Sequence, residues 1–144
     1  MSTMTIPTTV CQLIDSGPLA HLTTLGPDGS PQVTVVWVGI EGDEFVLGHM
    51  GVWQKVKNIR RDPRVALSLL GHSKNPIGLH EYLVVYGKAR ITEGGAADLL
   101  QRLAKIYLGP DIVFPPEPYR NRPGYITRIT PERFDGVGPW KPGQ

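Results

Sequence analysis

The chain has 144 residues, of which 40% are hydrophobic and 19% charged, and its 15 Lys+Arg against 13 Asp+Glu give a net charge of +2. This length suits one globular domain, expected over residues 1–144, and the basic excess is too mild for a general nucleic-acid binder. The 17 Gly and 14 Pro residues exclude a coiled coil or a bundle of long helices, and the single cysteine excludes an intramolecular disulfide.

In chain order, the first part of the sequence predicts a short helix followed by three strands. Apolar residues at helical spacing predict the helix over Pro7–Ser16, which Gly17-Pro18 ends. Alternating and β-branched residues between turn signals then predict strands at Leu19–Leu25, Gln32–Ile40 and Glu44–Met50. Because the turns between them are short, we expect these strands to form an antiparallel meander.

The rest of the chain alternates between helical and strand periods. Val52, Val56 and Ile59 recur at helical spacing, and Asp62-Pro63 ends this helix because the residue before a proline avoids the α region. Further strands are predicted at Arg64–Leu70, His80–Thr92 and Pro123–Ile129, with a loop over Gly71–Gly78, a helix over Gly94–Leu108 and no regular element over Phe134–Trp140. Six strands and two or three helices predict a mainly β fold, a small closed or half-closed β-barrel with the helices outside.

A basic stretch, Lys55 to Arg64, holds five of the 15 basic residues. It begins where a helix opens just after a strand, and the free N–H groups of such a helix end suit a phosphate, with Lys55 adding a point charge. The alternative is an ordinary solvated helix face with cations near its C-terminus, where the helix dipole favours them.

The predicted strand from Gln32 to Trp37 is a second candidate site. Alternation places Gln32, Thr34 and Val36 on one face and the remaining three residues on the other. Polar groups among β-branched residues suit the edge and face of a flat aromatic ligand, although a plain half-buried barrel strand has the same pattern. The four histidines have no partner at metal-ligand spacing, so no metal site is expected, and no nucleophile or nucleotide-binding motif is present.

Taken in order, four segments resemble the pyridoxamine 5′-phosphate oxidase-like split-barrel superfamily: Leu19–Thr24, Asp28–Val33, Lys55–Arg64 and Tyr86–Ala89. The Arg60-Arg61-Asp62-Pro63-Arg64 run and the short length are most similar to the actinobacterial flavin- and deazaflavin-dependent oxidoreductases that use coenzyme F420. The resemblance implies a six-stranded antiparallel FMN-binding split barrel of Greek-key type and a homodimer with cofactor sites at the subunit interface.

The resemblance also implies roles for individual residues. Lys55 corresponds to the family's phosphate-binding lysine, and Trp53 stands where relatives often place a basic residue, for which Lys57 is the expected substitute. The ring of the cofactor would meet Gln32, Val35 and Val36, and its ribityl-phosphate arm would border Gly48, His49 and Met50. His80 and Tyr82 would reach the cofactor from the second subunit. The segments Pro110–Pro123 and Pro139–Gly143 are expected to form substrate-side walls, with Trp140 covering the substrate.

The function that this resemblance implies is hydride transfer between F420 and an electron-poor small molecule. An FMN-dependent oxidase or reductase of the same fold, and a non-enzymatic protein that binds F420 or haem, remain alternatives. No protein nucleophile is required, so no catalytic residue is assigned, and His49, His80, Tyr82 or solvent are the candidate proton donors. Without a signal-type N-terminus or an apolar run that could span a bilayer, we expect a cytoplasmic protein with no membrane partner.

Overall fold

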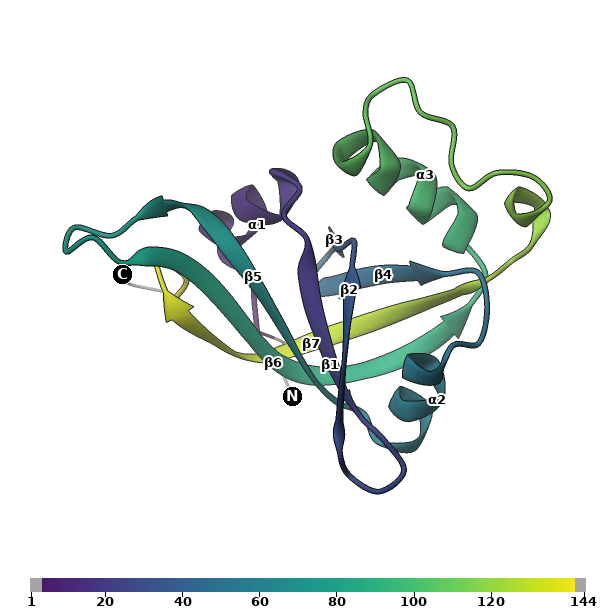
Figure 1. The fold of residues 1–144 in the computed structure, drawn as a ribbon, viewed down its shortest axis with the longest axis horizontal. Helices are drawn as coiled ribbons and strands as arrows, with labels where there is room; N and C mark the ends of the chain where they lie inside the picture. The colour runs from purple at the N-terminus through teal and green to yellow at the C-terminus, as the bar shows by residue number, and fades with distance from the viewer. Residues whose placement is uncertain (1–3, 142–144) are drawn as a thin grey trace.

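The computed structural model describes residues 4–141, which form one strongly curved antiparallel sheet with three α-helices around it (Figure 1). The predicted domain 1–144, its N-terminal segment and the predicted wall Pro139–Gly143 extend in part beyond the described residues. The helices are α1 (Thr8–Asp15), α2 (Gln54–Arg61), α3 (Ala96–Tyr107) and the short 3₁₀ helix η1 (Tyr119–Asn121). The strands are β1 (Ala20–Leu25), β2 (Pro31–Val36), β3 (Gly39–Glu41), β4 (Glu44–His49), β5 (Arg64–Lys74), β6 (His80–Glu93) and β7 (Tyr125–Val137).

The sheet has the strand order β2-β1-β5-β6-β7-β4-β3. Its two edge strands, β2 and β3, are separated in the chain only by Trp37 and Val38, so the sheet has to curl until its edges approach one another. The predicted mainly β split barrel is thereby confirmed.

The strand count is seven rather than six because the predicted strand Gln32–Ile40 breaks after Val36. At the break the Val38 N–H donates to the hydroxyl of Tyr107 (3.2 Å). The predicted meander is wrong for the same reason, since β2 pairs with β1 and only the short β3 pairs with β4.

Two further strands run beyond their predicted ends. β5 continues through the predicted loop to Lys74, and β7 continues through Phe134 to Val137. The long strand β6 supplies the ladder partner for both, with pairs from Tyr82↔Val137 to Glu93↔Tyr125 along β7. Gly136 fits this ladder because its φ is +109° and a Cβ there would collide with the Tyr82 carbonyl. Gly136, which in the sequence indicates a break in the strand, therefore allows β7 to pair closely with β6.

The core fills the inside of the curled sheet and includes the fully buried Phe45, Leu22, Leu67, Leu83 and Ile129. Trp140 belongs to this core: it is 4% exposed and its Nε1 donates to the Tyr82 carbonyl (2.8 Å). The structure therefore corrects the expectation that Trp140 covers the substrate. A second apolar cluster joins α3 to β4 and β7. Within residues 4–141, no helix has the length and apolar composition needed to cross a bilayer.

Candidate functional site

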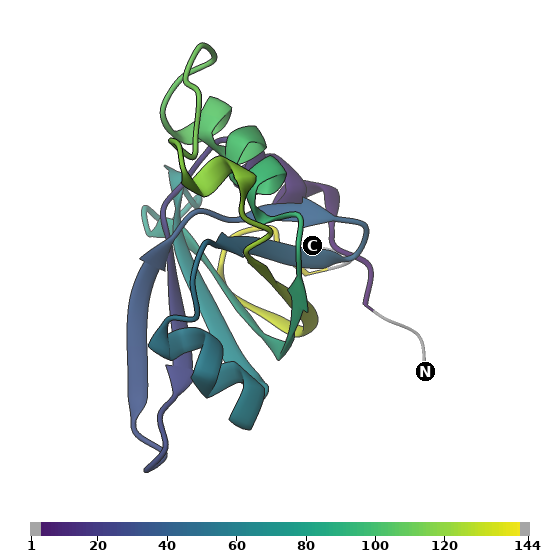
Figure 2. The same cartoon turned by 90° about the vertical axis from the view of Figure 1, so that its right-hand side faces the viewer.

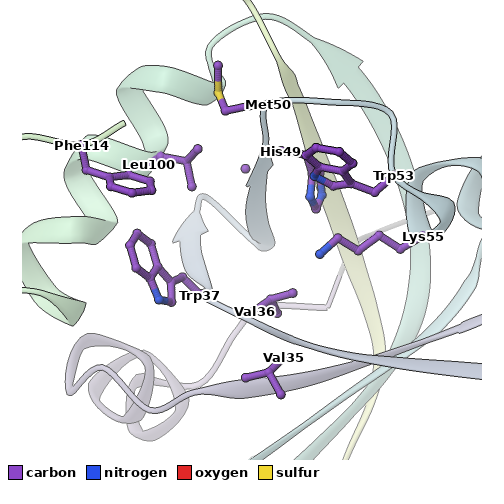
Figure 3. Close-up of a pocket in the computed structure, with 10 residues that line it drawn as sticks. Val35, Val36, Trp37, His49, Met50, Trp53, Lys55, Leu100 and Phe114 are labelled. Atoms are coloured by element: carbon purple, nitrogen blue, oxygen red, sulfur yellow. The ribbon is translucent and has the colours of Figure 1, made fainter. Parts of the chain in front are cut away.

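A cavity of about 310 Å³ lies between β2 and β4, where the barrel is not closed by strand pairing (Figure 3). We call this opening the seam of the barrel. Its position follows from the topology: within the described chain β2 has a strand partner on one side only, and β3 pairs with β4 no further than Val46. The backbone thus leaves a gap that side chains of both strands line. The lining residues are Val35, Val36, Trp37, Gly48, His49, Met50, Trp53, Lys55, Leu100 and Phe114.

Seven of the eleven residues predicted for cofactor binding meet in this cavity. Val35 and Val36 come from β2, and Gly48, His49 and Met50 from the end of β4. The other two, Trp53 and Lys55, come from the start of α2.

Lys55 lies in the first turn of α2 and its ammonium end points into the cavity (Figure 3). Its side chain is half-buried, and burial lowers the pKa of the amine because the charged form loses hydration. In the described chain no side chain caps the N-terminus of α2 at Trp53. The backbone N–H groups of that turn and the lysine charge therefore both favour an anion at this end of the cavity.

Buried Asn58 fixes α2 to the sheet, and the sequence reasoning missed it. Its Nδ2 donates to Thr24 Oγ1 (3.0 Å) and Gln32 Oε1 (2.8 Å), and its Oδ1 accepts from Gln54 Nε2 (2.9 Å) and Arg61 (3.1 Å). Because Asn58 follows Lys55 by three residues, it lies near the same face of the helix and sets the position of the lysine. Gln32, predicted as a ligand residue, contributes its amide oxygen to this network and does not line the cavity.

His49 is 3% exposed and its Nε2 lies 2.7 Å from the hydroxyl of Thr127. Burial, and secondarily the charge of Lys55, lower the pKa of His49 to about 4. The ring is therefore neutral at pH 7, which makes it a hydrogen-bonding group and a poor proton donor.

The opposite end of the cavity is formed by Trp37, Leu100 and Phe114, none of which was predicted as a site residue. Trp37 turns inward because the chain breaks out of β2 just before it, whereas strict alternation placed it with the outward Val33 and Val35. Phe114 belongs to the connector after α3, so the prediction that Pro110–Pro123 borders the pocket is supported at this residue.

Three further residues predicted for the site lie outside the cavity: Lys57, His80 and Tyr82. Lys57 is exposed on another side of α2. His80 Nε2 lies 2.8 Å from the Gly71 carbonyl oxygen, and Tyr82, 41% exposed, lies on the outer face of the sheet near His21 and Leu70. Within one chain, therefore, His80 and Tyr82 do not contribute to this cavity.

Thr34, on β2, carries an unsatisfied polar group. Among the described residues, its Oγ1 is the only buried side-chain nitrogen or oxygen without a hydrogen-bond partner. Thr34 lies on the same face of β2 as Val36, which lines the cavity. Buried polar groups are usually paired, so this hydroxyl points to a missing partner.

The electrostatics of the cavity are one-sided. Among the residues that the structure describes, His49 and Lys55 are the only ionisable ones in its lining, and no carboxylate lines it. In the part of the chain that the structure describes, no three His, Cys, Asp or Glu side chains are grouped to hold a metal ion. The arrangement suits an anionic ligand with a flat, apolar portion.

The antiparallel barrel is open between β2 and β4, where the cavity lies, and this architecture is called a split barrel. A family model described as pyridoxamine 5′-phosphate oxidase matches residues 6–138, and the chain belongs to this family. The superfamily resemblance found in the sequence is therefore confirmed, and the fold is that of flavin- and deazaflavin-type oxidoreductases.

Solved structures agree with this assignment. The chain is similar to an F420 reductase, with a TM-score of 0.71 and 28% identity over 90% of this chain and 98% of the other. It is similar to a conserved hypothetical protein from Mycobacterium tuberculosis, with a TM-score of 0.71 and 25% identity over 96% and 86%. HupZ from Group A Streptococcus shares the fold, with a TM-score of 0.62 and 19% identity over 92% and 94%. A search of curated proteins found no match.

Proposed function

We propose that the chain is an F420-dependent oxidoreductase, which transfers a hydride between the deazaflavin and an electron-poor small molecule. The observation that carries the proposal is the position of Lys55: its ammonium group enters the cavity beside the uncapped start of α2, across from the flat wall of β2. The similarity to an F420 reductase at 28% identity favours F420 over other cofactors of the family.

The residues present fit such a cofactor. Lys55 and the first turn of α2 would hold a phosphate, and Val35 and Val36 would lie against a ring.

When bound, F420 supplies the hydride donor or acceptor, and the protein supplies binding, orientation and electrostatics. Trp37, Leu100 and Phe114 form an apolar wall at one end of the cavity. His49 is held by a hydrogen bond with the hydroxyl of Thr127, and burial lowers its pKa to about 4, so the ring orients a bound cofactor as a neutral hydrogen-bonding group.

Titration of the purified chain with F420 and, separately, with FMN tests the proposal. We expect saturable binding of F420 and, when the protein is given reduced F420 and an electron-poor acceptor, a return of the absorbance of the oxidised cofactor as the hydride passes to the acceptor. The site could also bind FMN, because a phosphate and a flat ring are common to both cofactors. A protein that purifies yellow and binds FMN more tightly than F420 would favour the FMN-dependent alternative. Binding without hydride transfer across a broad acceptor panel would favour a carrier of F420 or haem, and binding of neither F420 nor FMN would end the oxidoreductase proposal.

We also propose that two copies of the chain pair through the outer face of β2, β1, β5 and β6. Apolar side chains stand exposed on this face: Val33, Val35, Leu70, Tyr82 and Tyr86, each between 39% and 62% exposed. In the described chain, no helix covers the outer side of β1 and β2 (Figure 2). Exposed apolar side chains gathered on one face mark an interaction site, and a two-fold axis would bury this face against itself.

A second copy is the favoured partner because the face continues into the site: Val35 belongs both to this surface and to the cavity lining. A partner packed here would bring its own Tyr82 and His80 toward the cavity mouth, as the family resemblance implies. Sedimentation velocity tests the pairing. We expect a dimer that Leu70→Arg converts to a monomer, whereas Val113→Arg, at a 63% exposed apolar residue away from the sheet, leaves it a dimer. A monomeric wild-type chain would refute the pairing.

A further inference from the structure

The end of the cavity remote from Lys55 is an aromatic corner, defined here as Trp37, Leu100 and Phe114. The rings of Trp37 and Phe114 have centroids 5.2 Å apart and are tilted by 55°. Within residues 4–141, no ionisable side chain lines this end (Figure 3). Its chemistry therefore differs from that of the Lys55 end, and the two ends suit different parts of a reacting pair.

Trp37 is held rigidly from behind. Its ring stacks on Tyr107 with centroids 5.3 Å apart and planes 8° apart. The Tyr107 hydroxyl donates to the Pro18 carbonyl (2.7 Å) and accepts from the Val38 N–H (3.2 Å). One wall of the corner is thus fixed by both stacking and hydrogen bonds.

Gln101 holds the other wall. It follows Leu100 on α3, its Nε2 donates to the Ile112 carbonyl (2.8 Å), and its Oε1 accepts from the Phe114 N–H (3.0 Å). Before Phe114 the connector is exposed, with Ile112 and Val113 at 40% and 63%, whereas Pro115 after it is buried and the Phe114 ring packs on Trp37. The two hydrogen bonds on either side of Val113 therefore fix the exposed side of the connector and, with that packing, set the position of Phe114.

We propose that the aromatic corner receives a flat, weakly polar ring of the substrate, and that Gln101 is the positioning residue that preorganises Phe114 for it. Aromatic side chains bind rings through apolar contact and offset or edge-to-face packing, and a wall fixed in advance loses less entropy on binding. The statement that this ring belongs to the substrate rests on the proposed function. The statement that the aromatic corner binds a flat ring does not depend on it.

Isothermal titration calorimetry with two matched probes tests the corner. The probes are 2-naphthol, which is flat and uncharged at pH 7, and decahydro-2-naphthol, which has the same carbon skeleton but is not flat. We expect 2-naphthol to bind at least about tenfold more tightly, and Phe114→Ala to weaken it by about tenfold, the size of an aromatic contact. Equal affinity for the two probes would overturn the assignment of a flat ring.

A double-mutant cycle tests the role of Gln101. Because Gln101 acts through Phe114, Gln101→Leu weakens 2-naphthol binding about fivefold alone and adds nothing to Phe114→Ala. Gln12→Leu, the same change at an exposed glutamine of α1, leaves binding unchanged. Independent, multiplying effects of Gln101→Leu and Phe114→Ala would refute the positioning role. Neither titration needs a cofactor, so a failure to bind F420 or FMN would overturn the oxidoreductase proposal and leave the corner standing.

Discussion

Replacing Lys55 with alanine removes the positive charge that points into the cavity and leaves the backbone of α2 in place. A hydrogen bond to a charged group contributes about 1.5–3 kcal/mol, so we expect affinity for F420 to fall by roughly 10- to 150-fold. Binding is not abolished, because the N–H groups of the first turn still favour the phosphate. Titration of F420 fluorescence at fixed ionic strength gives the two dissociation constants.

Two lysine variants make this result interpretable. Lys57→Ala changes the same helix two residues later at an exposed position, and Lys88→Ala changes a lysine on β6 that lies 3.9 Å from Glu132. Both should bind F420 as the wild type does. Burial lowers the pKa of Lys55, which means that the folded state disfavours its charge, so Lys55→Ala should keep or raise the free energy of unfolding. Equal losses of affinity in Lys55→Ala and Lys57→Ala would show that the helix is only a solvated basic face.

Urea unfolding checks three further predictions. Thr34→Val removes the unpartnered buried hydroxyl and should raise the free energy of unfolding by about 1 kcal/mol; a loss of stability would show that the hydroxyl has a hydrogen-bond partner. The pKa of His49 is about 4 in the folded chain and 6.5 in the unfolded chain, so its contribution to the free energy of unfolding is fully present above pH 6.5. As the pH falls toward 4, the unfolded chain binds the proton more readily and the free energy of unfolding falls by about 3 kcal/mol. The variant His49→Gln should not show this pH-dependent fall. Asn58→Ala should cost about 3 kcal/mol by leaving Thr24 and Gln32 without their buried partner.

The order of helices and strands could be predicted where turn chemistry punctuates the chain. Gly17-Pro18 and Asp62-Pro63 end helices close to the observed limits, at Asp15 and Arg61. The failures occur where a distant partner decides. Phe134 to Val137 joins β7 because β6 is long enough to pair with it, and nothing local in that segment indicates the pairing.

The candidate site was predicted best where one short stretch carries it. Lys55 and Trp53 are close in sequence to β4, so their meeting with His49 follows from a strand-to-helix connection. The aromatic corner combines residues from three distant segments, at Trp37, Leu100 and Phe114. Only the tertiary fold brings these together, and the break of β2 before Trp37, which turns the ring inward, depends on Tyr107 seventy residues away.

The seam of the barrel also bears on solubility. In the described chain β2 is an edge strand, and an unpaired strand edge is a template for pairing with other chains. Val35 and Val36 of this edge line the cavity, so a ligand bound there lies directly beside it. The chain with a ligand bound is therefore expected to aggregate less on heating than the chain without one. The bound ligand would cover the unpaired edge of β2 and hinder its pairing with strands of other chains.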